Sequence, residues 1–240
     1  MKAVILAAGE GERMRPLTLT TPKPMIKLHG KPYLEWILDE IVESGIMPEN
    51  IGVVVEYKKE QIEDYFRKHP VYSVITIINQ DPERRGTGGA TLACRNFTGN
   101  EDFLLLMGDM MYSRRTIDEL AKLKDAFCYV GVFRVSLEEA HKYGVMRVDG
   151  DFVIEILEKP KSPPDNLINA AIYKLTSEIY GALENVSPHE KDGRTEYWIT
   201  DAFRSLGGKG GKVKWHEAEM LFDLGCPDDI PKAEEILSRL

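Results

Sequence analysis

The chain opens with a run of six apolar residues, 3–8 (AVILAA), that stops abruptly at Gly9. Such a run is too short for an ordinary helix but suits a β-strand that is buried on both faces. Beyond it the sequence places glycines at positions 9 and 11, then Arg13 and Arg15. Glycine lets several backbone N–H groups face one anion, and arginine is a permanently charged fork that matches phosphate oxygens. The stretch therefore predicts a strand followed by a phosphate-binding loop.

Positive charge is concentrated at the same end of the chain. Residues 1–31 contain six Lys or Arg against two Glu, a net charge of +4, whereas the whole chain has −8, so the other 209 residues carry −12. Lys23, between two prolines, adds a cation that we expect to be held away from the core. Two common phosphate loops do not fit, because Glu12 follows Gly11 where a Walker loop needs Lys, and Met14 stands where a dinucleotide fingerprint needs glycine. A plain strand-to-helix turn with surface arginines is the alternative.

The composition excludes several other classes of protein. The 240 residues, 43% of them hydrophobic, are enough for one large or two small globular domains, and no apolar run approaches 18 residues, so no membrane partner is expected. A net charge of −8 and a pI near 5.3 disfavour a nucleic-acid partner. Cys94, Cys128 and Cys226 are odd in number and lack metal-binding spacing, so they are expected to be reduced packing residues. We expect a cytoplasmic protein.

Apolar runs and helical patterns alternate through the first half of the chain. This alternation predicts parallel strands joined by right-handed crossovers, a three-layer α/β fold whose ligands bind beyond the carboxyl ends of the strands. In the second half, Asp149-Gly150-Asp151 between two apolar runs is typical of a hairpin, so the sheet there should be mixed. After the first strand, further strands are expected at residues 51–55, 74–78, 103–107, 127–134, 145–148, 152–157, 167–173 and, last, 213–215. Helices are expected at residues 34–45 and 60–68, from about residue 91, and at residues 194–206 and 228–240.

Two further polar segments follow predicted strands. Gln80 comes before a loop, residues 81–90 (DPERRGTGGA), whose glycines suit either a ligand contact or a flexible connection into a helix. Asp109 comes directly after residues 103–107 (FLLLM), where a charged side chain leaves the core. It is poorly placed as a random surface charge, although it could cap the next turn.

The runs LAAGEGERMRPLT and PKPM resemble the signature of the sugar-1-phosphate nucleotidyltransferases, also called nucleotide-sugar pyrophosphorylases. Glu12 stands where many members have Ser or Thr. The resemblance extends from Lys2 to the last helix and implies a Rossmann-like nucleotidyltransferase fold with a mainly parallel central sheet and a mixed sugar-binding half. We expect one domain, residues 1–240, with a nucleotide-binding half (1–135) and a sugar-phosphate-binding half with the C-terminal helix (136–240). The chain is similar to glucose-1-phosphate thymidylyltransferase or uridylyltransferase members without the C-terminal β-helix, so no acyltransferase or regulatory second domain is expected.

The resemblance also implies roles for individual residues. Arg13 and Lys23 would be catalytic cations, and Asp109 with Asp223 would bind Mg²⁺, which typically takes one or two protein carboxylates. Members usually have glycine where Ala171 stands. The nucleotide would be bound by Leu6, Ala8, Gly9, Gly11, Gln80, Gly86, Thr87 and Gly108, and the sugar phosphate by Tyr143, Gly144, Glu158, Lys159, Asn169 and Thr200.

Several of these residues have plainer interpretations when they are taken alone. Glu158 and Lys159 could be a solvated pair at a strand end, and Thr200 could have a core or capping role. Asp223 could be a turn residue before glycine, which is common.

The function implied by the resemblance is nucleotidyl transfer from an NTP to a sugar 1-phosphate, a hexose 1-phosphate being expected, with release of pyrophosphate. UTP or dTTP is favoured, because Gln80 could present an acceptor and a donor side by side to N3–H and O4 of uracil or thymine. The alternatives are a cytidylyltransferase that acts on a non-sugar phosphate and a catalytically silent regulatory subunit of the same fold. A dehydrogenase would need the missing third glycine. A homo-oligomer is compatible with the sequence.

Overall fold

The computed structural model describes residues 1–191, 193–207 and 212–239. Within these residues the central sheet has nine strands, of which neighbours are hydrogen-bonded. Their order is β5 (Thr76–Asn79), β4 (Ile51–Val55), β1 (Lys2–Leu6), β6 (Phe103–Met107), β11 (Leu167–Leu175), β8 (Cys128–Arg134), β14 (Val213–Glu217), β10 (Phe152–Glu158) and β9 (Gly144–Asp149). Small antiparallel pairs are formed by β7 (Met110–Tyr112) with β15 (Met220–Asp223), β12 (His189–Lys191) with β13 (Arg194–Glu196), and β2 (Lys27–Leu28) with β3 (Lys31–Pro32).

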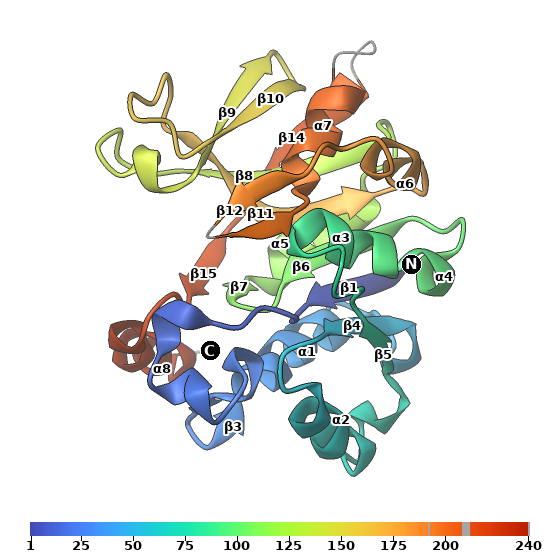
Figure 1. Cartoon of the computed structure of the whole chain (residues 1–240), viewed down its shortest axis with the longest axis vertical. Coiled ribbons are helices and arrows are strands. Elements are labelled where there is room, and N and C mark those ends of the chain that lie inside the picture. Colours follow the sequence, from blue (N-terminus) through green and yellow to red (C-terminus); the bar gives the residue numbers. More distant parts are fainter. Residues whose placement is uncertain (192, 208–211, 240) are drawn as a thin grey trace.

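Helices cover both faces of the sheet and make three layers, as the alternation predicts. Alternate residues of β1 enter different cores, because successive side chains of a strand point to opposite faces: Ile5 packs in one core and Val4 in the other. Figure 1 shows α1, α2 and α8 below β1 and β6, and α3, α6 and α7 above them. The first core receives α1 (Tyr33–Glu43), α2 (Lys59–Arg67), α5 (Arg114–Lys122) and α8 (Ile230–Leu237), and the second α3 (Gly86–Ala93), α4 (Arg95–Thr98), α6 (Glu178–Leu183) and α7 (Ile199–Gly207).

Strand directions divide the sheet as expected. β5, β4, β1 and β6 are mutually parallel, whereas β11 runs antiparallel to both β6 and β8. β14 is parallel to β8, and the hairpin of β9 and β10 closes the far edge of the sheet. The predicted α/β fold with a mainly parallel first half and a mixed second half is therefore confirmed. No helix among the described residues is long and apolar enough to cross a membrane.

Four expectations about elements are wrong. The helix after Gln80 begins at Gly86 rather than near residue 91, so its glycines belong to α3. Residues 194–196 form strand β13, and the helix expected at 194–206 begins only at Ile199. A further strand, β15, follows β14 and carries Asp223. The final helix is shorter than expected, Ile230–Leu237, and Leu240, its expected end, lies outside the described residues.

Ala171 has a left-handed backbone with φ +53°, where β11 has a bulge between Asn169 and Tyr173. A side chain in this region costs about 1–2 kcal/mol, which explains why a glycine suits the position. We predict that Ala171→Gly raises the free energy of unfolding by about 1 kcal/mol, the strain relieved less the lost Cβ contact. Urea unfolding checks this, with Ala170→Gly, at a fully buried neighbour, as the destabilising control. An equal loss of unfolding free energy in both variants would show that the backbone of Ala171 is not strained.

Candidate functional site

The carboxyl ends of β1 and β6 lie side by side and begin the candidate site. The two strands are in parallel register, with Leu6 opposite Met107, and the N–H of Gly108 donates to the carbonyl oxygen of Leu6 over 2.8 Å. A Cβ on Gly108 would lie 2.8 Å from that same oxygen, so this position requires glycine. The carbonyl of Ala8 likewise accepts from the N–H of Tyr57 (3.4 Å). These contacts place the loop after β1 beside Asp109.

The glycine loop is shaped by its own backbone. Gly11 has φ +64°, and a Cβ there would lie 2.9 Å from Cγ2 of Thr18 and 3.1 Å from Cβ of Lys23. The hydroxyl of Thr18 donates to the carbonyl of Gly11 over 2.9 Å, which holds the loop against the segment that carries Lys23. Gly9, by contrast, is exposed, with open space around it. Its backbone is therefore accessible to a ligand, while Gly11 serves the packing of the loop.

Lys23 is buried, contrary to the expectation that it is held away from the core. Only 8% of the residue is exposed, and its Nζ lies 2.8 Å from Oδ2 of Asp109. Lys23 begins a short 3₁₀ turn, Lys23–Met25, that follows Pro22 in an extended backbone, and Lys23 is one of the buried residues of this turn. A cation from the first loop is thus paired with the carboxylate that follows β6. A buried ion pair is stable only when its geometry is good, because both charges have lost their contacts with water. In this pair the ammonium group of Lys23 donates a hydrogen bond directly to the Asp109 carboxylate.

Asp223 joins this pair from the far end of the chain. β15 pairs with β7 so that Asp223 lies opposite Met110, and the N–H of Leu224 donates to the carbonyl of Asp109 over 2.9 Å. Burial, and then the Asp109 carboxylate, raise the pKa of Asp223 to about 6, while the charges of Lys23 and Arg13 act in the opposite direction. The two carboxylates and two cations form one electrostatic group.

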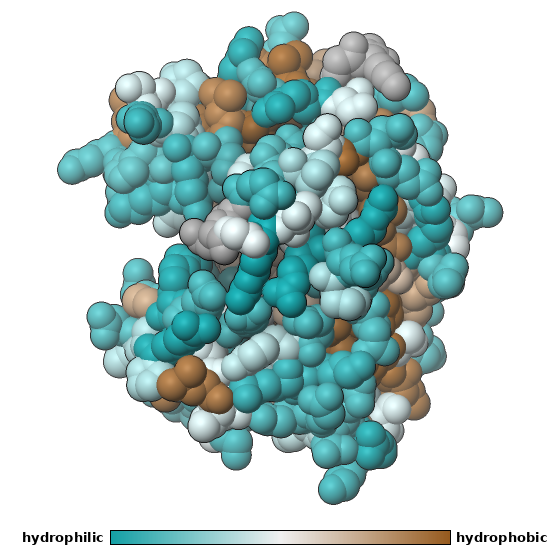
Figure 2. All heavy atoms as spheres, viewed as in Figure 1, coloured by the Kyte–Doolittle hydropathy of each residue, from teal (hydrophilic) through white to brown (hydrophobic). Residues whose placement is uncertain are grey.

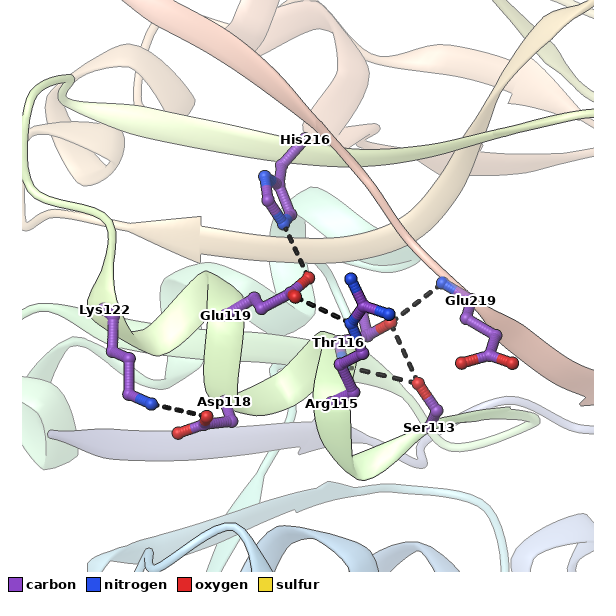
Figure 3. A network of polar contacts seen from close by, with 8 residues as sticks. All are labelled: Ser113, Arg115, Thr116, Asp118, Glu119, Lys122, His216 and Glu219. Atoms are coloured by element: carbon purple, nitrogen blue, oxygen red, sulfur yellow. Dashed lines mark hydrogen bonds and ion pairs between the residues drawn. The ribbon is translucent and has the colours of Figure 1, made fainter.

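A polar network fixes the start of β15, which delivers Asp223 (Figure 3). The N–H of Glu219 donates to Oγ1 of Thr116 on α5 over 2.8 Å, and the N–H of Ser113 donates to the carbonyl of Glu219 over 3.0 Å. Beside this network, Oε1 of Glu119 on α5 accepts a hydrogen bond from Nε of Arg115 (2.8 Å), and Oε2 of Glu119 is hydrogen-bonded to Nε2 of His216 on β14 (3.2 Å). The segment between β14 and β15 is therefore tied to α5.

Asp109 and Asp223 fit a divalent cation that takes few protein ligands. Among the described residues no group of three or more His, Cys, Asp or Glu could hold a metal ion. The described part of the chain therefore offers no site in which the protein alone would supply three or more such ligands. Oδ1 of Asp223 is buried and has no hydrogen-bond partner, so one carboxylate oxygen is left for a ligand. One or two carboxylates, with phosphates and water as the other ligands, is the usual magnesium site of phosphate-transferring enzymes.

Gln80 is held in one orientation by the backbone around it. Its amide nitrogen donates to the carbonyls of Arg84 (2.9 Å) and Gly86 (3.2 Å). Both partners are acceptors, so the amide cannot be turned round without setting its oxygen against them. Only Oε1 remains for a ligand. The expected donor-and-acceptor pair is therefore wrong, because the donor is already used.

The glycines after Gln80 serve packing as well as any ligand. A Cβ on Gly89 would lie 1.7 Å from the carbonyl oxygen of Arg84, and one on Gly86, at φ +87°, 2.5 Å from the carbonyl oxygen of Tyr197. The hydroxyl of Thr87, expected at the nucleotide, accepts from the N–H of Ile199 (3.1 Å) at the start of α7. The first turn of α3 is thus pressed against the entry to α7.

A carboxylate that the sequence did not single out joins three segments. Oε1 of Glu10, in the glycine loop, accepts hydrogen bonds from Nη1 of Arg85 (3.2 Å) and from Nη1 of Arg194 (2.6 Å). Although burial acts to raise it, the hydrogen bonds from Arg85 and Arg194 lower the pKa of Glu10. The only signal in the sequence was the acidic residue between two glycines, which alone names no partner.

The second half contributes a separate polar group. Gly144 lies opposite Glu158 in the hairpin, and a Cβ on Gly144 would come 3.4 Å from Oε2 of Glu158 and 3.6 Å from Cβ of Asn169. The N–H of Lys159 donates to the carbonyl of Tyr143 over 3.1 Å, and its exposed Nζ lies 3.8 Å from Glu158. These five residues are brought together.

Other parts of the second half are used internally. The side chain of Asn169 bridges Tyr173 (2.8 Å) and the N–H of Ala171 (2.9 Å). Thr200 is half-buried in the first turn of α7, and no hydrogen bond between described residues joins its side chain to the group around Gly144. Figure 2 shows a hollow at the left, between the part with β9 and β10 and the part with α8, bordered mostly by hydrophilic residues.

Fold and site together define an α/β protein with a cationic glycine loop that faces a pair of carboxylates at the strand ends. The family model described as nucleotidyl transferase matches residues 2–239. The chain belongs to the nucleotidyl transferase family. Nucleotidyltransferases of this family generally use a divalent metal.

Named relatives support the same family. The chain is 38% identical over 239 residues to "Bifunctional protein GlmU" of Methanocaldococcus jannaschii, with 99% of this chain and 54% of that protein covered. It thus spans about half the length of the first curated relatives it matches. It is 35% identical over 246 residues to "UTP--glucose-1-phosphate uridylyltransferase AglF" of Haloferax volcanii, with 99% and 96% covered. A solved UDP-glucose pyrophosphorylase in complex with UDP-glucose has a TM-score of 0.84 at 25% identity, over 99% of this chain and 98% of that one.

We predict that Lys23→Met destabilises the protein, because Asp109 would then face Asp223 without its cation. The expected loss is about 1–3 kcal/mol in the free energy of unfolding by urea, and added Mg²⁺ should recover part of it. Lys27→Met is the matched control, an exposed lysine nearby for which the described residues offer no ion pair. Equal stability of the two variants would show that the buried pair contributes nothing.

Proposed function

We propose that the chain transfers a nucleotidyl group from an NTP to a sugar 1-phosphate, a hexose 1-phosphate being favoured, and releases pyrophosphate. The observation that carries the proposal is the convergence of Lys23, Asp109, Asp223 and Arg13 at the ends of β1, β6 and β15. Two anionic substrates repel each other, so a site that joins them needs cations. Relatives with this activity in their names support the same conclusion.

In the proposed reaction, a phosphate oxygen of the sugar 1-phosphate attacks the α-phosphorus of the NTP in line and displaces pyrophosphate. The nucleophile is already an anion, so no general base is required, and catalysis consists of positioning and charge neutralisation. Arg13 would neutralise the triphosphate and the leaving pyrophosphate. Lys23 and Lys159 would draw the two phosphates together, the first from the buried pair and the second from the exposed end of β10.

Asp109 and Asp223 would hold Mg²⁺, which when bound neutralises the phosphates and orients them. The glycine loop (Gly9, Gly11) would bind the triphosphate through its backbone. We propose that residues 1–135 form the nucleotide-binding half and 136–240 the sugar-phosphate-binding half, in which Tyr143, Gly144, Glu158, Asn169 and Thr200 would contact the sugar. A cytoplasmic setting suits the scattered, free cysteines.

The base would be chosen mainly by the free oxygen of Gln80. Because its nitrogen is bound to Arg84 and Gly86, Gln80 offers one acceptor. Uracil and thymine present a donor, N3–H, to such an acceptor, whereas cytosine presents an unprotonated N3 and would be repelled. UTP or dTTP should therefore be preferred to CTP, and O4 must find its donor elsewhere.

The direct test of the proposal is pyrophosphate release, measured across five NTPs and several sugar 1-phosphates. We expect turnover with UTP or dTTP and a hexose 1-phosphate. Turnover only with CTP and a non-sugar phosphate would instead identify the cytidylyltransferase alternative, and no turnover with any pair would identify a silent subunit.

We predict that Asp109→Asn and Asp223→Asn each leave a folded protein but reduce kcat by about 10²- to 10³-fold, because each removes charge from the phosphate site. Asp64→Asn is the control, since that carboxylate lies on the surface of α2 and pairs with Arg67 (3.0 Å). Circular dichroism checks the fold, and steady-state kinetics checks the rate. Near-normal turnover of both site variants at saturating Mg²⁺ would refute the metal assignment.

We also predict that Gln80→Ala narrows the UTP-over-CTP ratio of kcat/KM by about 1–2 kcal/mol, on the order of tenfold, since one hydrogen bond and one repulsion are lost. The ratio of the two kcat/KM values is compared because a general loosening of the loop after Gln80 would lower both values alike and leave their ratio unchanged. A wild-type preference for ATP or GTP, or an unchanged ratio in Gln80→Ala, would show that another group reads the base.

A further inference from the structure

Two arginines from distant parts of the chain converge on one carboxylate oxygen of the glycine loop. Oε1 of Glu10 accepts hydrogen bonds from Nη1 of Arg194 (2.6 Å) and from Nη1 of Arg85 (3.2 Å). Arg194 lies on β13, and Arg85 lies at the end of the loop that joins Gln80 to α3. Two like charges that share one contact repel each other unless an anion lies between them. The two guanidinium groups therefore form an anion site, which the carboxylate of Glu10 occupies.

The charges around these arginines balance while Glu10 is in place. Nη2 of Arg85 lies 3.8 Å from Oε1 of Glu56, which follows β4. Within the described part of the chain, Arg194 has no ion pair other than the one with Glu10. If the side chain of Glu10 moves away, both guanidinium groups can bind a different anion.

Glu10 can move away without disturbing the packing of its loop. It is flanked by Gly9, which is exposed with open space around it, and by Gly11, whose backbone is closely packed. A backbone rotation at Gly9 can therefore swing the side chain of Glu10 outward while Gly11 stays in place. The side chains of Arg85 and Arg194 are 36% and 48% exposed, so an anion from solvent can reach both.

A triphosphate suits this site better than the carboxylate does. Guanidinium groups bind carboxylate and phosphate oxygens with the same planar fork, and a triphosphate carries several negative charges where Glu10 carries one. Because Glu10 belongs to the loop that would bind the triphosphate, phosphates held there would come within reach of both arginines. The same phosphates would be repelled by the carboxylate of Glu10, so the two anions compete.

We propose that Glu10 is an autoinhibitory anion, whose carboxylate holds Arg85 and Arg194 until the triphosphate of an incoming nucleotide displaces it and accepts their hydrogen bonds. The inference rests on the proposed function, since it assumes that the glycine loop binds the triphosphate. It gives Glu10 a negative effect on phosphate affinity, which a purely structural ion pair would not have.

The test removes the two ends of one ion pair separately. Binding of inorganic tripolyphosphate is measured by isothermal titration calorimetry in EDTA, so that no metal contributes, and circular dichroism checks the fold. We expect Glu10→Gln to lower the dissociation constant by about tenfold and Arg194→Gln to raise it by about tenfold, because one removes a competing anion and the other a cation. If the contact only ties β13 to the glycine loop, both variants break it, and both should change the affinity in the same direction.

Glu184→Gln and Arg95→Gln are the matched controls. Nη1 of Arg95, on α4, donates to Oε1 of Glu184, at the end of α6, over the same 2.6 Å, and both side chains are about half-exposed. Neither residue belongs to a segment that would contact the nucleotide. We expect both control variants to bind tripolyphosphate as the wild type does.

Arg13→Gln separates this inference from the phosphate site itself. If Arg13→Gln weakens binding while Glu10→Gln and Arg194→Gln change it in the same direction or not at all, the phosphate site stands and the role of Glu10 is overturned. If the wild type binds no tripolyphosphate, the glycine loop is not a phosphate site, and the inference falls together with that part of the proposed function.

Discussion

The ion pair between Lys23 and Asp109, with Asp223 beside it, is the constraint on which the rest of the site depends. Two carboxylates brought together at strand ends repel each other, and burial, followed by the Asp109 carboxylate, raises the pKa of Asp223. One buried lysine bonds Asp109, and Arg13 acts on Asp223 from the glycine loop. A divalent cation held between the two carboxylates would reduce the repulsion that remains between them.

The fold creates this corner from three distant parts of the sequence. β1 and β6 are adjacent and parallel, so their carboxyl ends deliver the glycine loop and Asp109 to one edge. The last strands of the chain return to the same place, because the network between α5 and Glu219 directs β15 against β7. The hairpin of β9 and β10, at the far edge of the sheet, carries the second polar group. The site thus lies where the parallel and the mixed parts of the sheet meet.

The sequence predicted the buried strands well, because apolar runs such as residues 51–55 and 103–107 have few other interpretations. It failed where distant contacts override local preference. α3 begins at Gly86 because its glycines permit close approach to other backbone segments. Residues 194–196 are extended because they pair with β12, and Arg85 adds a bridge to Glu196 and accepts from the N–H of Tyr197. The burial of Lys23 depends on its bond to Asp109, 86 positions away along the chain, which no local pattern reveals.

Crystals grown with Mn²⁺ and a non-hydrolysable UTP analogue would show whether Asp109 and Asp223 jointly hold a divalent cation opposite the cationic loop, because manganese gives an anomalous signal at its own position. We expect one strong anomalous peak within ligand distance, about 2.0–2.4 Å, of oxygens from both carboxylates and from the nucleotide phosphates. A peak bound to neither Asp109 nor Asp223, in crystals that contain the nucleotide, would rule out this metal site.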